Sequence, residues 1–311
     1  MTILLATDFD VQALGLWRSL LQAALPEEHI VTERHALGAA DADVAIVANP
    51  PPGTLQGLTQ LRLIQSLWAG VDRLLADATV PPAVPIARMV DPAMSATMSE
   101  TALWAVLSLH RGFHTYAAQQ RVKVWQPLPQ RRADEVAIAM LGLGELGRCV
   151  ARCLVAQGYR VSGWSLRPAA LPSIATHHGD DALTSVLGTA DIVINLLPLT
   201  PDTRGLFCAR RLDAMRPGAS LVNLARGGHV VDADLLAALD SGHLHHAVLD
   251  VFNAEPLPAE HRYWQHPKVT VLPHAAAQTD PRSAAEIAAA NVRRLRAGEP
   301  LQNLVDRGRG Y

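Results

Sequence analysis

The chain has 311 residues, of which 49% are apolar and 18% charged, a composition typical of a globular protein and not of a disordered one. This length predicts roughly two domains. Lys and Arg total 27 against 29 Asp and Glu, so the charge balance gives no electrostatic reason to expect nucleic acid or an anionic membrane as a partner.

Targeting and redox signals point to the cytoplasm. The segment MTILLATDFD lacks the basic flank and small-residue cleavage site of a signal peptide, and no apolar run approaches the roughly 18 residues of a membrane span. The chain has three cysteines without C-x-x-C spacing, which favours a reducing compartment over a disulfide framework. We therefore expect a cytoplasmic protein with no metal site and no nucleic-acid or membrane partner.

The first hundred residues alternate short apolar runs with helical patterns, as a small α/β domain does. We expect strands at 3–6, 44–48, 63–65 and 86–88, and a helix at 11–24. The stretch SLWAGVD at 66–72 reads as a strand whose end could present the backbone N–H groups of Ala69, Gly70 and Val71 to a carboxylate. An ordinary strand-to-helix turn explains it equally well.

A long helix is expected next, over residues 98–120. Thr97 and Glu100 have the spacing of a capping box, and the helix would lead from the first domain into the second. The segment KVWQPLPQRR at 123–132 is then a polar loop, in which Trp125 is either an exposed interface anchor or partly buried.

The central feature of the chain is VAIAMLGLGELG at 136–147, a charge-free strand followed by glycines in G-x-G-x-x-G spacing. In a dinucleotide site, Gly142 makes the tight turn, Gly144 lets the backbone approach a pyrophosphate, and Gly147 lets the helix pack on the strand. The anion would lie at the helix N-terminus. The pattern alone also fits a plain tight connection between a strand and a helix.

The remaining chain keeps alternating strands and helices, which indicates a parallel sheet with crossover helices. We expect strands at 159–164, 191–197, 219–224, 246–251 and 269–272, and helices at 145–157, 232–240 and 281–297. The final segment LQNLVDRGRGY is expected to return to the first domain. The predicted domains are thus 1–97 plus 282–311, and 98–281.

Ligands of such sheets collect at the carboxyl ends of the strands. There the sequence places Arg226, Asp250, Glu255 and His274. Each has an ordinary structural explanation when taken alone. Together they suit the reduction of a 2-oxo acid, since a carboxylate-paired histidine is a good general acid and arginine binds a carboxylate through two hydrogen bonds.

These motifs identify a family. The chain resembles the D-2-hydroxyacid dehydrogenases, and among them the glyoxylate/hydroxypyruvate reductase A group. The resemblance rests on GLGELG at 142–147, NLARG around Arg226, LDVFNAEP with Glu255, Pro273-His274, SLWAGVD, VWQPLP at 124–129, NLLPLTPDT at 195–203 and the closing VDRGRGY.

The resemblance implies a Rossmann-type doubly wound sheet, a smaller flavodoxin-like substrate domain, and an active site in the cleft between them. It assigns substrate binding to Arg226, orientation of the histidine to Glu255 and proton donation to His274. Ala69, Gly70 and Val71 would complete carboxylate binding, and a homodimer would form through the long helix and the Trp125 loop. The implied cofactor-binding residues are Gly142, Gly144, Glu145, Leu146, Gly147, Ser165, Arg167, Leu197, Pro198, Thr203, Leu224, Ala225, Asp250 and Ala276.

The end of the second strand indicates which nicotinamide is used. An NAD enzyme usually carries an acidic residue about 20 residues beyond the glycines, whereas this strand ends in Ser165-Leu166-Arg167. A hydroxyl and a guanidinium suit a 2′-phosphate, so we expect NADPH, with NADH possible. Leu166 and Pro168 stand where similar reductases carry a second basic residue.

Three alternatives compete with a glyoxylate or hydroxypyruvate reductase. Another 2-oxo acid reductase of the same family would share every motif. A formate dehydrogenase is disfavoured, because that family has glutamine where Glu255 stands. A non-enzymatic dinucleotide-sensing protein would keep the fold without needing the Arg226, Glu255 and His274 set.

Overall fold

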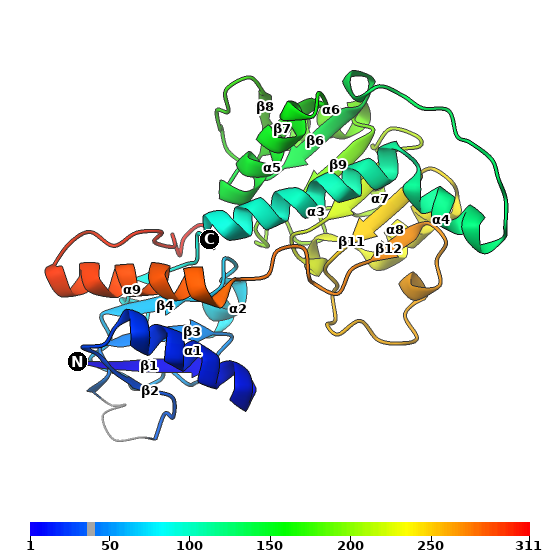
Figure 1. The fold of residues 1–311 in the computed structure, drawn as a ribbon. Coiled ribbons are helices and arrows are strands. Elements are labelled where there is room, and N and C mark those ends of the chain that lie inside the picture. The colour runs from blue at the N-terminus through cyan, green and yellow to red at the C-terminus, as the bar shows by residue number, and fades with distance from the viewer. Residues whose placement is uncertain (36–40) are drawn as a thin grey trace. The chain divides into compact units, whose positions relative to one another are not determined.

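The computed structural model describes residues 1–35 and 41–311, which divide into two compact units (Figure 1). Unit 1 comprises Met1–Met94 and Thr279–Tyr311, and unit 2 comprises Ser95–Gln278. Within the described ranges, no helix combines the length and apolar character needed to cross a bilayer.

Unit 1 is built on a five-stranded parallel sheet in the order β2-β1-β3-β4-β5. Its strands are β1 (Thr2–Thr7), β2 (His29–Val31), β3 (Val44–Ala48), β4 (Leu63–Ser66) and β5 (Ile86–Ala87), and its helices are α1 (Val11–Ala24), α2 (Asp72–Ala76) and α9 (Pro281–Ala297). Alternate residues of β1 face opposite sides. Ile3 and Leu5 pack with α1 and α9, while Leu4 and Ala6 pack beneath the loops after β3.

The C-terminal segment returns to this sheet, as expected. The backbone N–H of Val305 donates to the carbonyl of Ile86, and Leu304 bridges Ala87. Arg307 donates to the carbonyl groups of Pro81 and Val84. The last residues therefore extend the edge of the unit 1 sheet.

Unit 2 contains a seven-stranded parallel sheet in the order β12-β11-β10-β9-β6-β7-β8. The strands are β6 (Ala137–Leu141), β7 (Arg160–Ser165), β8 (Ala175–His178), β9 (Ile192–Asn195), β10 (Ser220–Asn223), β11 (His246–Leu249) and β12 (Val269–Val271). The helices are α3 (Pro92–His110), which begins in unit 1, α4 (Phe113–Arg121), α5 (Glu145–Ala156), α6 (Asp180–Thr189), α7 (Ala209–Asp213) and α8 (Asp232–Asp240). Short 3-10 turns lie at Ala133–Glu135, Gly227–His229 and Arg262–Trp264.

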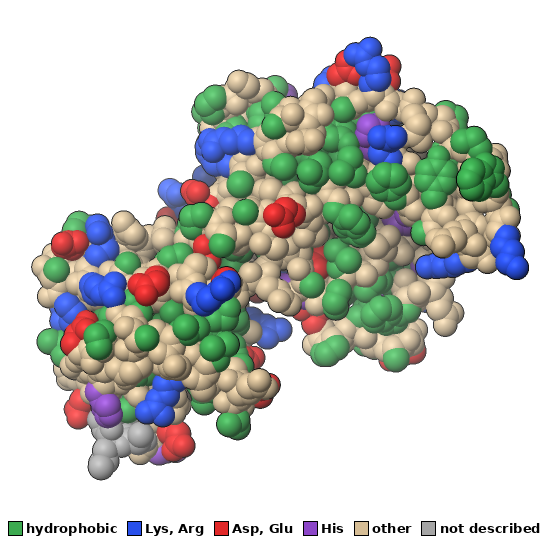
Figure 2. Space-filling view, in the orientation of Figure 1, with side chains coloured by type: hydrophobic (Ala, Val, Ile, Leu, Met, Phe, Trp, Pro, Cys, Tyr) green, Lys and Arg blue, Asp and Glu red, His purple; other side chains and the backbone are tan. Residues whose placement is uncertain are grey.

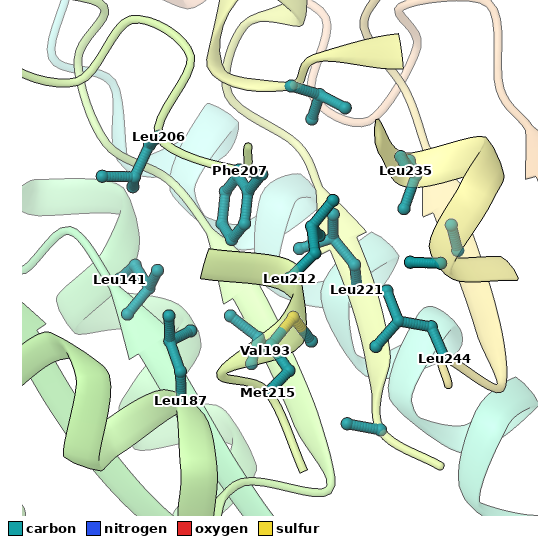
Figure 3. Close-up of a cluster of buried hydrophobic side chains, with 14 of the residues drawn as sticks. Leu141, Leu187, Val193, Leu206, Phe207, Leu212, Met215, Leu221, Leu235 and Leu244 are labelled. Atoms are coloured by element: carbon teal, nitrogen blue, oxygen red, sulfur yellow. The ribbon is translucent and has the colours of Figure 1, made fainter. Parts of the chain in front are cut away.

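Each face of this sheet carries its own apolar core. Ile138 and Met140 of β6 pack with α3 and α5, whereas Ala139 and Leu141 pack with α6, α7 and α8. Figure 3 shows the second cluster, in which Phe207 lies among leucines from several elements. Because the strand order reverses between β6 and β9, the edge where these two strands end is the expected ligand site of a doubly wound sheet.

The prediction of one long helix over residues 98–120 is wrong. Helix α3 begins at Pro92, where Asp91 accepts a hydrogen bond from the N–H of Ala93 at 2.8 Å, so the capping box predicted at Thr97 lies inside the helix. The helix ends at His110 and a separate α4 follows Gly112, whose φ of +69° no continuing helix can adopt. In the loop that follows, Trp125 is 99% exposed, which excludes the partly buried alternative.

Candidate active site

The three glycines in the turn between β6 and α5 have different surroundings. Gly142 has a φ of +97°, and a Cβ there would lie 2.6 Å from the carbonyl oxygen of Leu196. A Cβ at Gly147 would lie 1.8 Å from the carbonyl oxygen of Gly142. A Cβ at Gly144 would meet no atom within 4 Å, so protein packing does not explain this glycine.

The N-terminus of α5 offers donors beside Gly144. The backbone N–H groups of Glu145, Leu146 and Gly147 donate to no acceptor in the described part of the chain. Free N–H groups at a helix N-terminus bind anions, and the open side of Gly144 leaves room for one. These residues therefore fit the pyrophosphate of a dinucleotide.

Arg148, which sequence analysis did not single out, ties this turn to the loop after β7. Its Nε donates to the carbonyl of Leu143 at 2.7 Å and its Nη1 to that of Ala170 at 2.9 Å. In the same loop, the hydroxyl of Ser165 donates to the carbonyl of Arg167 at 2.7 Å, and the exposed Arg167 guanidinium bonds no described residue. The loop thus presents a free cation and no carboxylate at the end of β7.

Two buried asparagines, also missed from the sequence, organise the ends of β9 and β10. The Asn195 amide donates to Oδ1 of Asn223 at 3.0 Å. Asn195 accepts from the N–H of Leu197, and Asn223 donates to the carbonyl of Arg226 at 3.0 Å. The repeated Asn-Leu at the two strand ends is the sequence signal that could have revealed the pair.

The loop after β9 is fixed by Thr203. Its hydroxyl is buried, donates to the carbonyl of Pro198 at 2.7 Å and accepts from the N–H of Thr200 at 2.8 Å. Leu197 in this loop is buried, as are Leu224 and Ala225 after β10. Thr203, one of the residues assigned to cofactor binding, therefore uses its hydroxyl to hold the shape of this loop.

Asp250, at the end of β11, holds the turn that carries His274. It is buried, and its carboxylate accepts hydrogen bonds from the N–H groups of Ala275 at 2.7 Å and of Ala276. Burial raises the pKa of Asp250, although these backbone hydrogen bonds oppose the effect. Its own carbonyl accepts from the N–H of His274 at 2.9 Å. His274 has a φ of +52°, which is uncommon for a residue with a side chain.

His274 and Glu255 are in direct contact. The Nδ1 atom of His274 lies 2.8 Å from one carboxylate oxygen of Glu255, and the other oxygen accepts from the N–H of Phe252 at 2.9 Å. The His274 side chain is 51% exposed, and its Nε2 bonds no described residue. Because the Glu255 carboxylate contacts Nδ1, the other ring nitrogen, Nε2, is left available to a substrate.

Arg226 lies in the turn after β10, beside the loop that carries Glu255. A Cβ at the next residue, Gly227, would lie 1.9 Å from the carbonyl carbon of Phe252, so only glycine allows this approach. The Nη1 atom of Arg226 donates to the carbonyl of Ala225 at 2.7 Å. The structure thus brings Arg226, Glu255 and His274 to one edge of the unit 2 sheet.

The three residues assigned to carboxylate binding in the first domain lie in unit 1, between β4 and α2. The N–H groups of Ala69, Gly70 and Val71 donate to no acceptor among the described residues. Three successive free N–H groups can bind a carboxylate. Among the residues that the structure describes, no group of three or more His, Cys, Asp and Glu side chains is arranged to hold a metal ion.

Known proteins share this architecture. The family model for the NAD binding domain of D-isomer specific 2-hydroxyacid dehydrogenases matches residues 103–276. A D-isomer specific 2-hydroxyacid dehydrogenase from Xanthobacter autotrophicus Py2, solved with NADPH and MES, is 40% identical with a TM-score of 0.94, over 100% of this chain and 99% of the other. An NADPH-dependent glyoxylate/hydroxypyruvate reductase from Sinorhizobium meliloti, solved with NADP and sulfate, is 33% identical with a TM-score of 0.93, over 100% and 99%.

A third solved structure, a D-isomer specific 2-hydroxyacid dehydrogenase family protein from Klebsiella pneumoniae 342, is 39% identical with a TM-score of 0.89, over 99% of this chain and 98% of that one. These similarities confirm the expected two-domain, Rossmann-type α/β fold. The chain belongs to the D-isomer specific 2-hydroxyacid dehydrogenase family.

Proposed function

We propose that the protein reduces small 2-oxo acids, such as glyoxylate and hydroxypyruvate, to 2-hydroxy acids with NADPH. The observation that carries this proposal is the His274–Glu255 pair, held at 2.8 Å with Nε2 of the histidine open to a substrate. It lies on the sheet edge that also carries Arg226. Support for these substrates comes from the similarity to the glyoxylate/hydroxypyruvate reductase of Sinorhizobium meliloti.

Each side chain has a distinct role in this proposal. A bound nicotinamide would supply a hydride to the 2-carbon of the substrate. His274 then donates the Nε2 proton to the developing alkoxide, and Glu255 orients the imidazole through its contact with Nδ1. Arg226 binds the substrate carboxylate, together with the free N–H groups of Ala69, Gly70 and Val71. Unit 1 is accordingly the substrate domain and unit 2 the dinucleotide domain.

The cofactor assignment rests on the N-terminus of α5 and the end of β7. The free N–H groups after Gly144 suit the pyrophosphate, and the unpaired guanidinium of Arg167 suits a 2′-phosphate. The Xanthobacter protein was solved with NADPH, and the Sinorhizobium protein with NADP. NADPH is therefore the preferred cofactor in the proposal, and NADH a poorer one.

The proposal includes a homodimer in the cytoplasm. Hydrophobic side chains gather over α4 on the face in view (Figure 2), and exposed ones include Phe113, Val122, Val124 and Trp125. Such a surface suits burial against a second copy of the chain. The cysteines Cys149, Cys153 and Cys208 are free, as suits a reducing compartment. Sedimentation equilibrium tests the dimer, and a monomer at micromolar concentration would reject it.

A matrix of 2-oxo acids against NADPH and NADH tests the activity, with loss of reduced cofactor as the readout. We expect turnover with glyoxylate and hydroxypyruvate, faster with NADPH. Turnover only of larger 2-oxo acids would favour another reductase of the family. NADPH binding without turnover of any 2-oxo acid would favour a dinucleotide-sensing protein.

A further inference from the structure

His229 is a buried histidine wedged between two loops of the candidate site. It closes the 3-10 turn Gly227–His229 and is 0% exposed. Its Nδ1 lies 3.0 Å from the carbonyl oxygen of Arg226, and its Nε2 lies 3.2 Å from that of Pro198. One ring thus contacts both the turn that carries Arg226 and the loop assigned to the cofactor.

The chemistry of these two contacts is unusual. Both partners are carbonyl oxygens, which only accept hydrogen bonds, while a neutral imidazole has a single N–H. The ring therefore donates to both loops only when both nitrogens carry a proton, and otherwise donates to one. With both nitrogens protonated, the ring donates to both carbonyl groups and thereby fixes the spacing between them.

Two other side chains donate hydrogen bonds to these carbonyl groups, one in each loop. The Thr203 hydroxyl donates to the carbonyl of Pro198 at 2.7 Å, and the Asn223 amide donates to that of Arg226 at 3.0 Å. His229 contacts both carbonyl groups, and its own carbonyl accepts from the N–H of Phe207 at 2.8 Å. It therefore links two loops that Thr203 and Asn223 hold separately.

We propose that His229 is a positioning residue that links cofactor binding to substrate binding. Its Nε2 fixes Pro198 in the loop beside the cofactor, and its Nδ1 fixes the backbone from which the Arg226 side chain reaches the substrate carboxylate. The role of the Arg226 contact in substrate binding rests on the proposed function, while the role of the Pro198 contact rests only on dinucleotide binding. The two roles can be separated experimentally.

Two substitutions each keep one contact. The amide nitrogen of glutamine is as many bonds from Cβ as Nε2 of histidine, and that of asparagine as many as Nδ1. His229→Gln should keep the contact with Pro198 and lose that with Arg226, and His229→Asn should do the reverse. Loss of one net hydrogen bond corresponds to a change in Kd of about fivefold to tenfold.

The experiment measures the Kd of NADPH, and the Kd of oxamate at saturating NADPH, by calorimetry. Oxamate resembles a 2-oxo acid but accepts no hydride. We expect His229→Asn to weaken NADPH about fivefold to tenfold with oxamate within about twofold, and His229→Gln to show the opposite. Equal weakening of both ligands by both variants, or no change in either, would overturn the proposal.

His246 provides a matched control. It is also buried in unit 2, but it begins β11 and its ring bonds the Thr270 hydroxyl at 2.9 Å. His246→Gln should lower the melting temperature without changing either Kd. If neither His229 variant folds, NMR of the wild-type protein with ¹⁵N-labelled histidine tests the proposal instead. NADPH should shift the resonance of one nitrogen of a buried imidazole, and oxamate should shift the resonance of the other nitrogen of the same ring. Unchanged resonances would overturn the proposal.

The outcomes also separate this inference from the proposed function. If the wild-type protein turns over no 2-oxo acid, the proposed function fails. The NADPH constants of the two His229 variants still decide whether the ring positions the cofactor loop, since only His229→Asn should weaken NADPH.

Discussion

Adding a methyl group at Gly144 should weaken cofactor binding without lowering the stability of the protein. Gly144 has extended backbone angles, φ −75° and ψ −168°, that alanine readily adopts, and a Cβ there would meet no atom within 4 Å. Gly144→Ala should therefore leave stability unchanged or raise it by up to about 1 kcal/mol, because alanine restricts the unfolded chain. The methyl group would instead occupy the space beside the free N–H groups of α5.

Gly147→Ala is the matched comparison, because its Cβ would lie 1.8 Å from the carbonyl oxygen of Gly142. Two backbone segments must separate to relieve this clash, and overpacking of this kind costs about 1 to 3 kcal/mol. For a unit of this size, that loss corresponds to a melting temperature lower by about 2 to 12 °C.

Thermal unfolding without ligand and calorimetric titration with NADPH distinguish the two variants. We expect Gly144→Ala to melt at or above the wild-type temperature and to bind NADPH at least about tenfold more weakly, since the pyrophosphate can no longer approach the backbone. Wild-type NADPH affinity in Gly144→Ala would refute the placement of the pyrophosphate at α5. A wild-type melting temperature in Gly147→Ala would refute the packing argument.

Three further substitutions test the side chains. Arg167→Ala should raise the KM for NADPH about tenfold and that for NADH less than about twofold, because only NADPH offers a 2′-phosphate, so equal changes would contradict the assignment. His274→Asn should lower kcat about 100-fold to 10,000-fold with the Kd of NADPH unchanged, and a near wild-type kcat would exclude it as proton donor. Arg226→Ala should raise the KM for the 2-oxo acid and also lower kcat, and an unchanged KM would contradict carboxylate binding.

The buried strands were predictable because their sequences are nearly continuous apolar runs. Strands such as β6 and β9 lie in the sheet interior, where both faces must be apolar. The edge strands β2 and β8 were missed. His29–Val31 has two buried apolar residues but is only three residues long, which is too short to form a pattern. Ala175–His178 is polar and largely exposed, so it carries no apolar pattern.

The helix error arose from competition between local signals. Thr97 and Glu100 have capping-box spacing, but Asp91 and Pro92 provide a stronger start, with a carboxylate cap and a proline at the first helical position. The helix ends because the chain turns at Gly112, where a Cβ would lie 2.5 Å from the Leu128 side chain. That contact comes from a loop 16 positions later, so no local pattern contains it.

The strand-end positions of Arg226, Glu255 and His274 could be derived from the sequence, but the way their backbones are fixed could not. His274 adopts a φ of +52°, a conformation that persists only where its surroundings enforce it. The buried carboxylate of Asp250 supplies that constraint by accepting the N–H groups of Ala275 and Ala276. Burying the Asp250 carboxylate is unfavourable in itself. Its hydrogen bonds hold the turn that carries His274, and the amide of Asn223 likewise holds the turn that carries Arg226. Polar groups buried beneath the strand ends thus fix the backbones that carry Arg226 and His274.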